Sequence, residues 1–204
     1  MEQTAIEILE KIARRTNREL VNSEQFLNKA LLSRIPQSKR WVTIKDYSGS
    51  YFVGCDSSSA SFNEYARISG VVIPVNLRHQ NFTLKLSEKD IVDKLNIFKK
   101  HTKTKDKEVD RNFVIDTNDV NATKQLLQNT NLRIKLIKAF QRIPGLKLEI
   151  NTLKLDHIPH LQGETFVSLY KKQWILEDKI IEELFELNNM VYERMLLTGV
   201  ATKI

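Results

Sequence analysis

The sequence is poor in the residue types that usually mark a specific chemistry. Its 204 residues include one cysteine, Cys55, with six dispersed glycines and four prolines. A lone cysteine cannot form an intramolecular disulfide, which excludes a disulfide framework and favours a reducing compartment. Dispersed glycines leave no glycine-rich phosphate loop. Because no nucleophile-base pair, metal-ligand set or cofactor motif is present, we predict no cofactor and no catalytic residue, and the sequence leans against an enzyme.

Long apolar runs are also missing. Crossing a bilayer takes roughly 20 apolar residues, and no stretch approaches that length. The first 18 residues carry recurring charges where a signal segment would have an apolar core. We therefore expect a soluble, cytoplasmic protein without a transmembrane segment. With 41% hydrophobic and 28% charged residues, the chain can bury one sizeable core.

Charge is unevenly distributed. The net charge is +7, yet residues 174–194 hold six acidic residues against two basic ones. The densest basic run, 99–107, has no aromatic or glycine residue of the kind that stacks on or clamps bases. It is read either as a solvated, mobile loop or as a surface for phosphates. That basic surface would consist of Lys99, Lys100, Lys103, Lys105 and Lys107.

The most informative stretch covers residues 109–127. Phe113, Val114 and Ile115 form a short apolar run of residues that favour strands. The polar cluster 116–119 ends this run with side chains that favour turns and helix N-caps. The stretch therefore predicts a strand that leads into a capped helix.

Helices are predicted at both ends of the chain. Apolar residues recur at helical spacing over 4–17, and Asn22 with Gln25 resembles a capping box for a second helix that ends before Pro36. The last and longest helix is predicted over 174–197. Its apolar stripe is wider than one buried face needs, so it meets either the N-terminal helix or a second copy of the chain. The residues of this interface would be Trp174, Leu184, Phe185, Met190 and Val191.

Strand patterns fill the middle of the chain. Residues 41–86 predict four strands in an antiparallel meander, with a turn over 46–50 between the first two strands and with Pro74 at an edge, a bulge or a strand end. A helix capped by Ser87 follows. Two helices, over 119–128 and 132–140, precede a hairpin around Asn151-Thr152 and a strand over 165–170. The prediction is an α+β protein with antiparallel strands and short helices. Its parts are a helical segment 1–36, a core 37–173 and a C-terminal helix 174–204, which together form one domain.

The run Asp110-Arg111-Asn112-Phe113-Val114-Ile115, with the following helices and the alternating residues 145–150, resembles a pattern found in uncharacterised bacterial proteins of unknown function. In that pattern an Asp-Arg-x-Phe-x-Val strand precedes a helix and a hairpin. The resemblance covers about residues 40–156. It implies an α+β domain and provides no catalytic residues to carry over. Proteins of this kind often have transmembrane segments near the N-terminus, and this chain has none.

Three groups of residues were weighed as sites. Asp110, Asp116 and Asp119 suggest a cation site, but an ion-paired Arg111 and a helix cap at Asn118 or Asp119 account for the same residues. His157 and His160 have no nearby cysteine or carboxylate at metal-ligand spacing, which favours a structural or surface loop. Cys55 would need His79 or His101 as a base, so a half-buried strand cysteine is the preferred interpretation.

Two functional classes follow from these observations. The first is a non-catalytic binding or scaffold domain that engages a protein partner or a second copy of itself. The second is a binder of an acidic polymer, either nucleic acid or an anionic membrane surface, through the basic run. An enzyme of unrecognised type ranks third.

Overall fold

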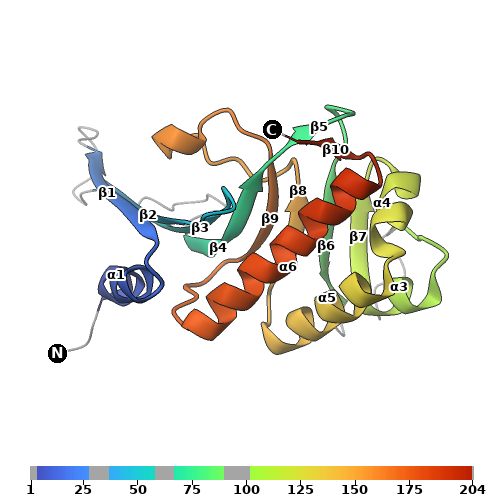
Figure 1. The fold of residues 1–204 in the computed structure, drawn as a ribbon, viewed down its shortest axis with the longest axis horizontal. Coiled ribbons are helices and arrows are strands. Elements are labelled where there is room, and N and C mark those ends of the chain that lie inside the picture. The colour runs from blue at the N-terminus through green and yellow to red at the C-terminus, as the bar shows by residue number, and fades with distance from the viewer. Residues whose placement is uncertain (1–3, 28–36, 58–66, 90–101, 204) are drawn as a thin grey trace. The chain divides into compact units, whose positions relative to one another are not determined.

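The structure is a computed structural model that describes residues 4–27, 37–57, 67–89 and 102–203 (Figure 1). For residues 23–27, 37–39 and 57 it describes the backbone only. The chain combines antiparallel strands with several helices, which confirms the predicted α+β class. Its internal contacts divide it into two compact units, residues 1–72 with 170–185 and residues 73–169 with 186–204.

The first unit contains a helix and four strands that follow one another in the order β1-β2-β3-β4. Neighbouring strands are antiparallel, and Cys55 of β3 faces Trp41 on one side and Ile68 on the other. The predicted turn between β2 and β3 is confirmed, and Gly49 closes it at φ +83°. The elements are α1 (Ala5–Arg15), β1 (Glu19–Leu27), β2 (Gln37–Lys45), β3 (Tyr51–Ser57) and β4 (Arg67–Pro74).

The predicted N-terminal amphipathic helix is confirmed as α1. Thr4 is its N-cap: the Thr4 hydroxyl accepts the Glu7 N–H at 3.3 Å, and the Glu7 carboxylate accepts the Thr4 N–H at 3.0 Å. This reciprocal pair satisfies two amide groups that a helix start would leave unpaired. The apolar face buries Leu9, Ile12 and Ala13.

The second helix predicted within segment 1–36 is wrong over the residues that the structure describes. Residues 19–27 form strand β1, which pairs with β2 from Glu19↔Lys45 to Leu27↔Gln37. Asn17 lies between the end of α1 and the start of β1, and its φ of +53° is not compatible with continuing the helix. Pairing along the whole length of β2 outweighs the weak local preference for a helix. Residues 28–36 lie outside the described part.

The second unit contains a sheet with strand order β9-β8-β6-β7, in which β6 is antiparallel to both β7 and β8. Inward residues alternate with outward ones, as in β6, where Leu84 and Leu86 are buried and Lys85 is exposed. A separate short pair joins β5 and β10. The elements are β5 (Asn76–Leu77), β6 (Leu84–Glu88), α3 (Lys107–Asn112), β7 (Phe113–Thr117), α4 (Val120–Leu127), α5 (Thr130–Arg142), β8 (Lys147–Ile150), η1 (Pro159–Leu161), β9 (Phe166–Lys171) and β10 (Ala201–Thr202).

The predicted strand and capped helix within 109–127 are confirmed as β7 and α4. The Asp119 carboxylate accepts the N–H groups of Asn121 and Ala122, both at 2.9 Å, and thereby caps α4. The following helix, α5, packs Phe140 edge-on against Phe113 of β7, with ring centroids 5.3 Å apart. Figure 1 shows α4 and α5 beside the sheet of this unit.

Three predictions for the middle of the chain need correction. The strand around residues 82–86 does not extend the meander, because β6 pairs with β7 and β8. Ser87 does not cap a helix, since it lies inside β6; residues 90–101 are outside the described part. The predicted hairpin around Asn151 is also absent, because residues 153–155 form no strand. The Asn151 side chain instead donates to the carbonyls of Gln80 and Phe82. Pro74 is the last residue of β4, as expected for a residue without an N–H.

The longest helix, α6 (Asp178–Leu197), starts later than the predicted Trp174. The buried Ser69 hydroxyl donates to the Gln173 carbonyl at 2.6 Å and accepts the Ile175 N–H at 2.7 Å. These two bonds hold the chain around Trp174 in a non-helical path, which delays the helix. None of the helices in the described ranges has the length and apolarity required to cross a bilayer.

Candidate functional site

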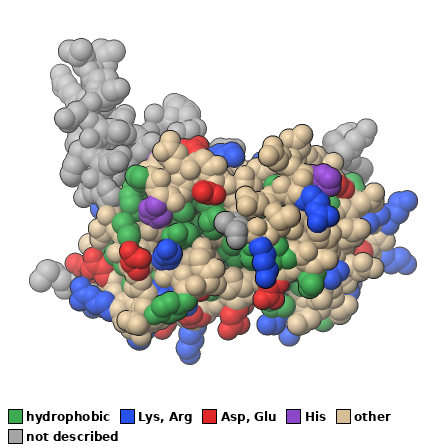
Figure 2. Space-filling view, turned by 45° about the horizontal axis from the view of Figure 1, so that its top comes forward, with side chains coloured by type: hydrophobic (Ala, Val, Ile, Leu, Met, Phe, Trp, Pro, Cys, Tyr) green, Lys and Arg blue, Asp and Glu red, His purple; other side chains and the backbone are tan. Residues whose placement is uncertain are grey.

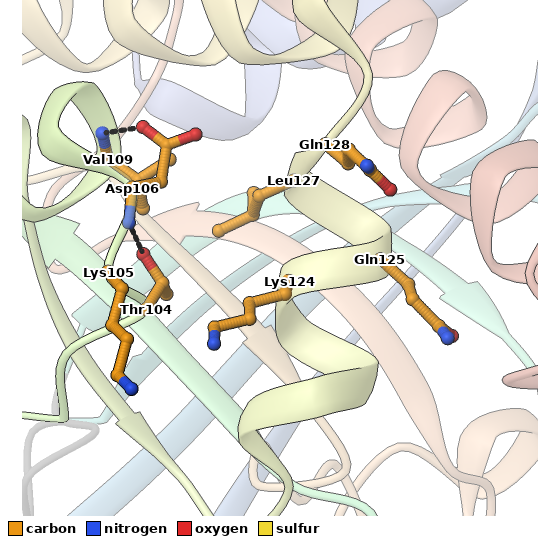
Figure 3. A pocket seen from close by; sticks show the side chains of 8 residues that line it. All are labelled: Thr104, Lys105, Asp106, Val109, Lys124, Gln125, Leu127 and Gln128. Atoms are coloured by element: carbon orange, nitrogen blue, oxygen red, sulfur yellow. Dashed lines mark hydrogen bonds between the residues drawn. The ribbon is translucent and has the colours of Figure 1, made fainter.

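The second unit contains a cavity of about 320 Å³ between the segment that enters α3 and the helix α4. Its floor is apolar, because Val109 and Leu127 are each 1% exposed. Its walls and rim are polar and carry two lysines (Figure 3). We call it the lysine cavity, and its lining residues are Thr104, Lys105, Asp106, Val109, Lys124, Gln125, Leu127 and Gln128.

One wall is a short loop held in shape by Asp110. Its carboxylate accepts the Thr104 N–H and hydroxyl, both at 2.8 Å, and the Lys105 N–H at 3.1 Å. Lys105 has φ +67°, a left-handed conformation that costs a residue with a Cβ roughly 1–2 kcal/mol. The three bonds to Asp110 offset this cost and fix the backbone from which the Lys105 side chain extends.

Asp106 lines the same wall but its charge is already engaged. Its carboxylate caps α3 by accepting the N–H groups of Glu108 at 2.9 Å and Val109 at 3.1 Å. Arg133, whose side chain is 14% exposed, lies 3.4 Å from Asp106 and 2.7 Å from Glu108. Asp106 is therefore engaged by the start of α3 and by Arg133, which it shares with Glu108.

The opposite wall is α4, which presents Lys124, Gln125 and Gln128. The helix is anchored at its start by the Asp119 cap and near its end by Arg194, whose guanidinium donates to the Gln125 carbonyl at 3.0 and 3.3 Å. In Figure 3 the Lys124 side chain extends from α4 toward the opposite wall, and the Lys105 side chain runs along that wall. A rigid frame thus supports two cationic side chains.

The lining combines charged and amide side chains with one engaged hydroxyl. Thr104 has the only hydroxyl among the lining side chains, and that hydroxyl donates to Asp110, which is not the arrangement of an activated nucleophile. No described cluster of three or more His, Cys, Asp or Glu residues is arranged to hold a metal ion.

The structure places only part of the predicted basic surface. Lys105 lines the lysine cavity, Lys103 precedes it, and Lys107 is the first residue of α3; all three are exposed. Lys99 and Lys100 lie outside the described residues. On the face seen in Figure 2, basic side chains of the described residues are interspersed with acidic ones and form no continuous stripe.

The residues predicted as an α6 interface are mostly inside the chain. Leu184, Phe185 and Val191 are 0%, 3% and 0% exposed, so they are not available to a partner in this structure. Trp174 and Met190 are partly exposed. The wide apolar stripe is therefore explained largely by packing within the chain, and the prediction of these residues as an exposed interface needs correction.

The three weaker sites resolve as follows. Asp119 and Asp110 serve as a helix cap and a loop brace, whereas Arg111 is exposed and forms no ion pair with a described residue. His160 lies in η1, shortly after His157. Cys55 is buried in β3, and burial, with a smaller effect of Asp56, raises its pKa to about 12, so the thiol stays protonated.

Sequence reasoning singled out Lys105 but missed its partners on α4. Lys124, Gln125 and Gln128 look like the solvated face of an ordinary amphipathic helix. The predicted cap at Asn118 or Asp119 indicated where this helix starts, but not that its side chains would lie opposite the segment 104–109. That placement depends on tertiary packing.

Comparison of the chain with known protein families, characterised proteins and solved structures gave no match.

Proposed function

We propose that this protein is a non-catalytic binding domain that engages a protein partner, and that the partner is held at the lysine cavity. The observation that carries the proposal is the lining itself. It offers an apolar floor, two lysines and two amides on a braced frame, without an activated nucleophile among its members. Binding sites typically combine an apolar base with a few convergent polar groups.

A second candidate is a binder of an acidic polymer, nucleic acid or an anionic membrane surface. It is favoured by the exposure of Lys103, Lys105 and Lys107 beside the cavity. Such binding would use many lysines together and fall steeply with salt. Engagement of a protein at the cavity would depend on its two lysines and be less sensitive to salt.

The first test is photocrosslinking in the cells that naturally express the protein. A photoreactive benzophenone side chain replaces Gln128, an exposed lining residue, and in a matched control it replaces Gln162, which is exposed in the same unit but does not line the cavity. The proposal predicts a discrete protein adduct from position 128 that is missing from position 162. The same adducts from both positions, or none from position 128, would count against it.

The captured protein must then bind the purified chain. We expect Lys124→Glu to weaken this binding by about tenfold or more, because it reverses a charge inside the cavity. Lys154→Glu is the matched control, since Lys154 is exposed in the same unit and does not line the cavity. Equal losses in the two variants would indicate a general charge effect and argue for the polymer binder.

A further inference from the structure

We propose that the lysine cavity binds a phosphate monoester, carried into it as a phosphorylated side chain of the protein partner; this inference rests on the proposed function. The first support is uncompensated charge. Lys105 and Lys124 both line the cavity, and no carboxylate of a described residue pairs with either. The one lining carboxylate, Asp106, accepts the N–H groups at the start of α3 and shares Arg133 with Glu108. The two lysines are therefore the lining charges that have no partner among the described residues.

The second support is the strained backbone that positions one of these charges. Lys105 adopts φ +67°, which residues other than glycine rarely do, and Asp110 holds it there with bonds to Lys105 and Thr104. A relaxed loop would not carry this cost. Backbone strain of this kind is often found where a side chain must be held for binding.

The third support is the match between donors and ligand. A phosphate monoester carries a charge of about −1.5 to −2 near neutral pH and three strong acceptor oxygens. Two ammonium groups offer three donors each, and the Gln125 and Gln128 amides are further donors on the α4 wall. A carboxylate or a phosphodiester carries a single charge and would leave one lysine unpaired. The apolar floor of Val109 and Leu127 lowers the local dielectric and strengthens such pairing.

The test is a titration of the isotopically labelled full chain, followed by backbone amide NMR. The probes are N-acetyl-O-phosphoserine amide, its unphosphorylated counterpart, N-acetyl-aspartate amide, inorganic phosphate and a single-stranded oligodeoxythymidine. The proposal predicts that the phosphoserine probe shifts the amides of residues 104–109 and 124–128 and binds more tightly than the other probes. Lys124→Gln should weaken it by about tenfold, Lys124→Arg should restore most of the loss, and Lys154→Gln should leave it unchanged.

Each other outcome overturns the inference in a specific way. Equal binding of the aspartate probe would make the cavity a carboxylate site, and equal binding of inorganic phosphate would make it a site for the free ion. Preference for the oligonucleotide would point to a phosphodiester backbone, and no shift at the cavity would remove the site. If phosphoserine fails while crosslinking from position 128 succeeds, the proposed function stands and only the ligand class is lost. If phosphoserine binds and crosslinking fails, the proposal of a protein partner is wrong and the ligand is a small phosphate ester.

Discussion

Replacing Gly54 with alanine should destabilise the first unit through one defined clash. A Cβ at this position would lie 2.3 Å from Cζ3 of Trp174 and 3.1 Å from Cγ1 of Val42. The indole cannot simply move away, because Ser69 bonds the backbone on both sides of Trp174, at Gln173 and Ile175. Overpacking of this kind costs about 1–3 kcal/mol. We therefore expect Gly54→Ala to lower the free energy of unfolding by about 2 kcal/mol.

Urea denaturation followed by circular dichroism measures this change, and a second substitution isolates its cause. Trp174→Leu removes the ring atoms that the new Cβ would meet. In that background Gly54→Ala should cost much less than in the parent, which a double-mutant cycle reports as a coupling energy of about 1 kcal/mol or more. The same cost in both backgrounds would refute the reasoning, and it would also return Trp174 to consideration as an exposed interface residue.

The remaining predictions concern charge, a thiol and a helix cap. Arg18 bonds Asp46 and Glu182 while its side chain is 11% exposed, so Arg18→Met should lower the urea midpoint by the equivalent of about 2 kcal/mol. Burial alone would raise the pKa of Asp46, but the bonds from Ser48 and Arg18 outweigh burial and hold that pKa below its usual value of 3.8. The ionised Asp46 therefore contributes stability above about pH 4, and this contribution is lost as the pH falls through the native pKa. Asp46→Asn should accordingly flatten the loss of stability below about pH 4, compared with the parent chain in urea titrations. Cys55 should react with a thiol reagent at neutral pH only as fast as the chain unfolds, and rapid labelling of the native protein would contradict its burial. Asp119→Ala should cost about 1 kcal/mol in thermal or urea unfolding through loss of the α4 cap.

Local patterns predicted the elements whose formation is governed by local chemistry. The turn at Gly49 and the cap at Asp119 each rest on bonds between residues at most four positions apart, so their sequence signals were sufficient. The same holds for strand β7, whose apolar run is bounded by turn-forming residues.

Predictions failed where distant residues decide. Asn22 and Gln25 look like a capping box, yet pairing with β2 makes β1 a strand. The start of α6 is delayed by Ser69, a residue more than a hundred positions earlier in the chain. The lysine cavity has the same character, because Lys105 and Lys124 come from segments on opposite sides of it and Asp110 braces the Lys105 backbone.

The central claim is that a protein partner is held at the lysine cavity. Multi-angle light scattering behind size exclusion tests it most directly, using the purified chain mixed with the protein captured from position 128. The runs compare low with high salt and include a mixed nucleic-acid competitor. We expect a complex with the summed mass of the two proteins, which survives the competitor at both salt concentrations and is lost with Lys124→Glu but not with Lys154→Glu. Two separate peaks, with the chain shifting only with nucleic acid at low salt, would contradict it and favour a binder of acidic polymers.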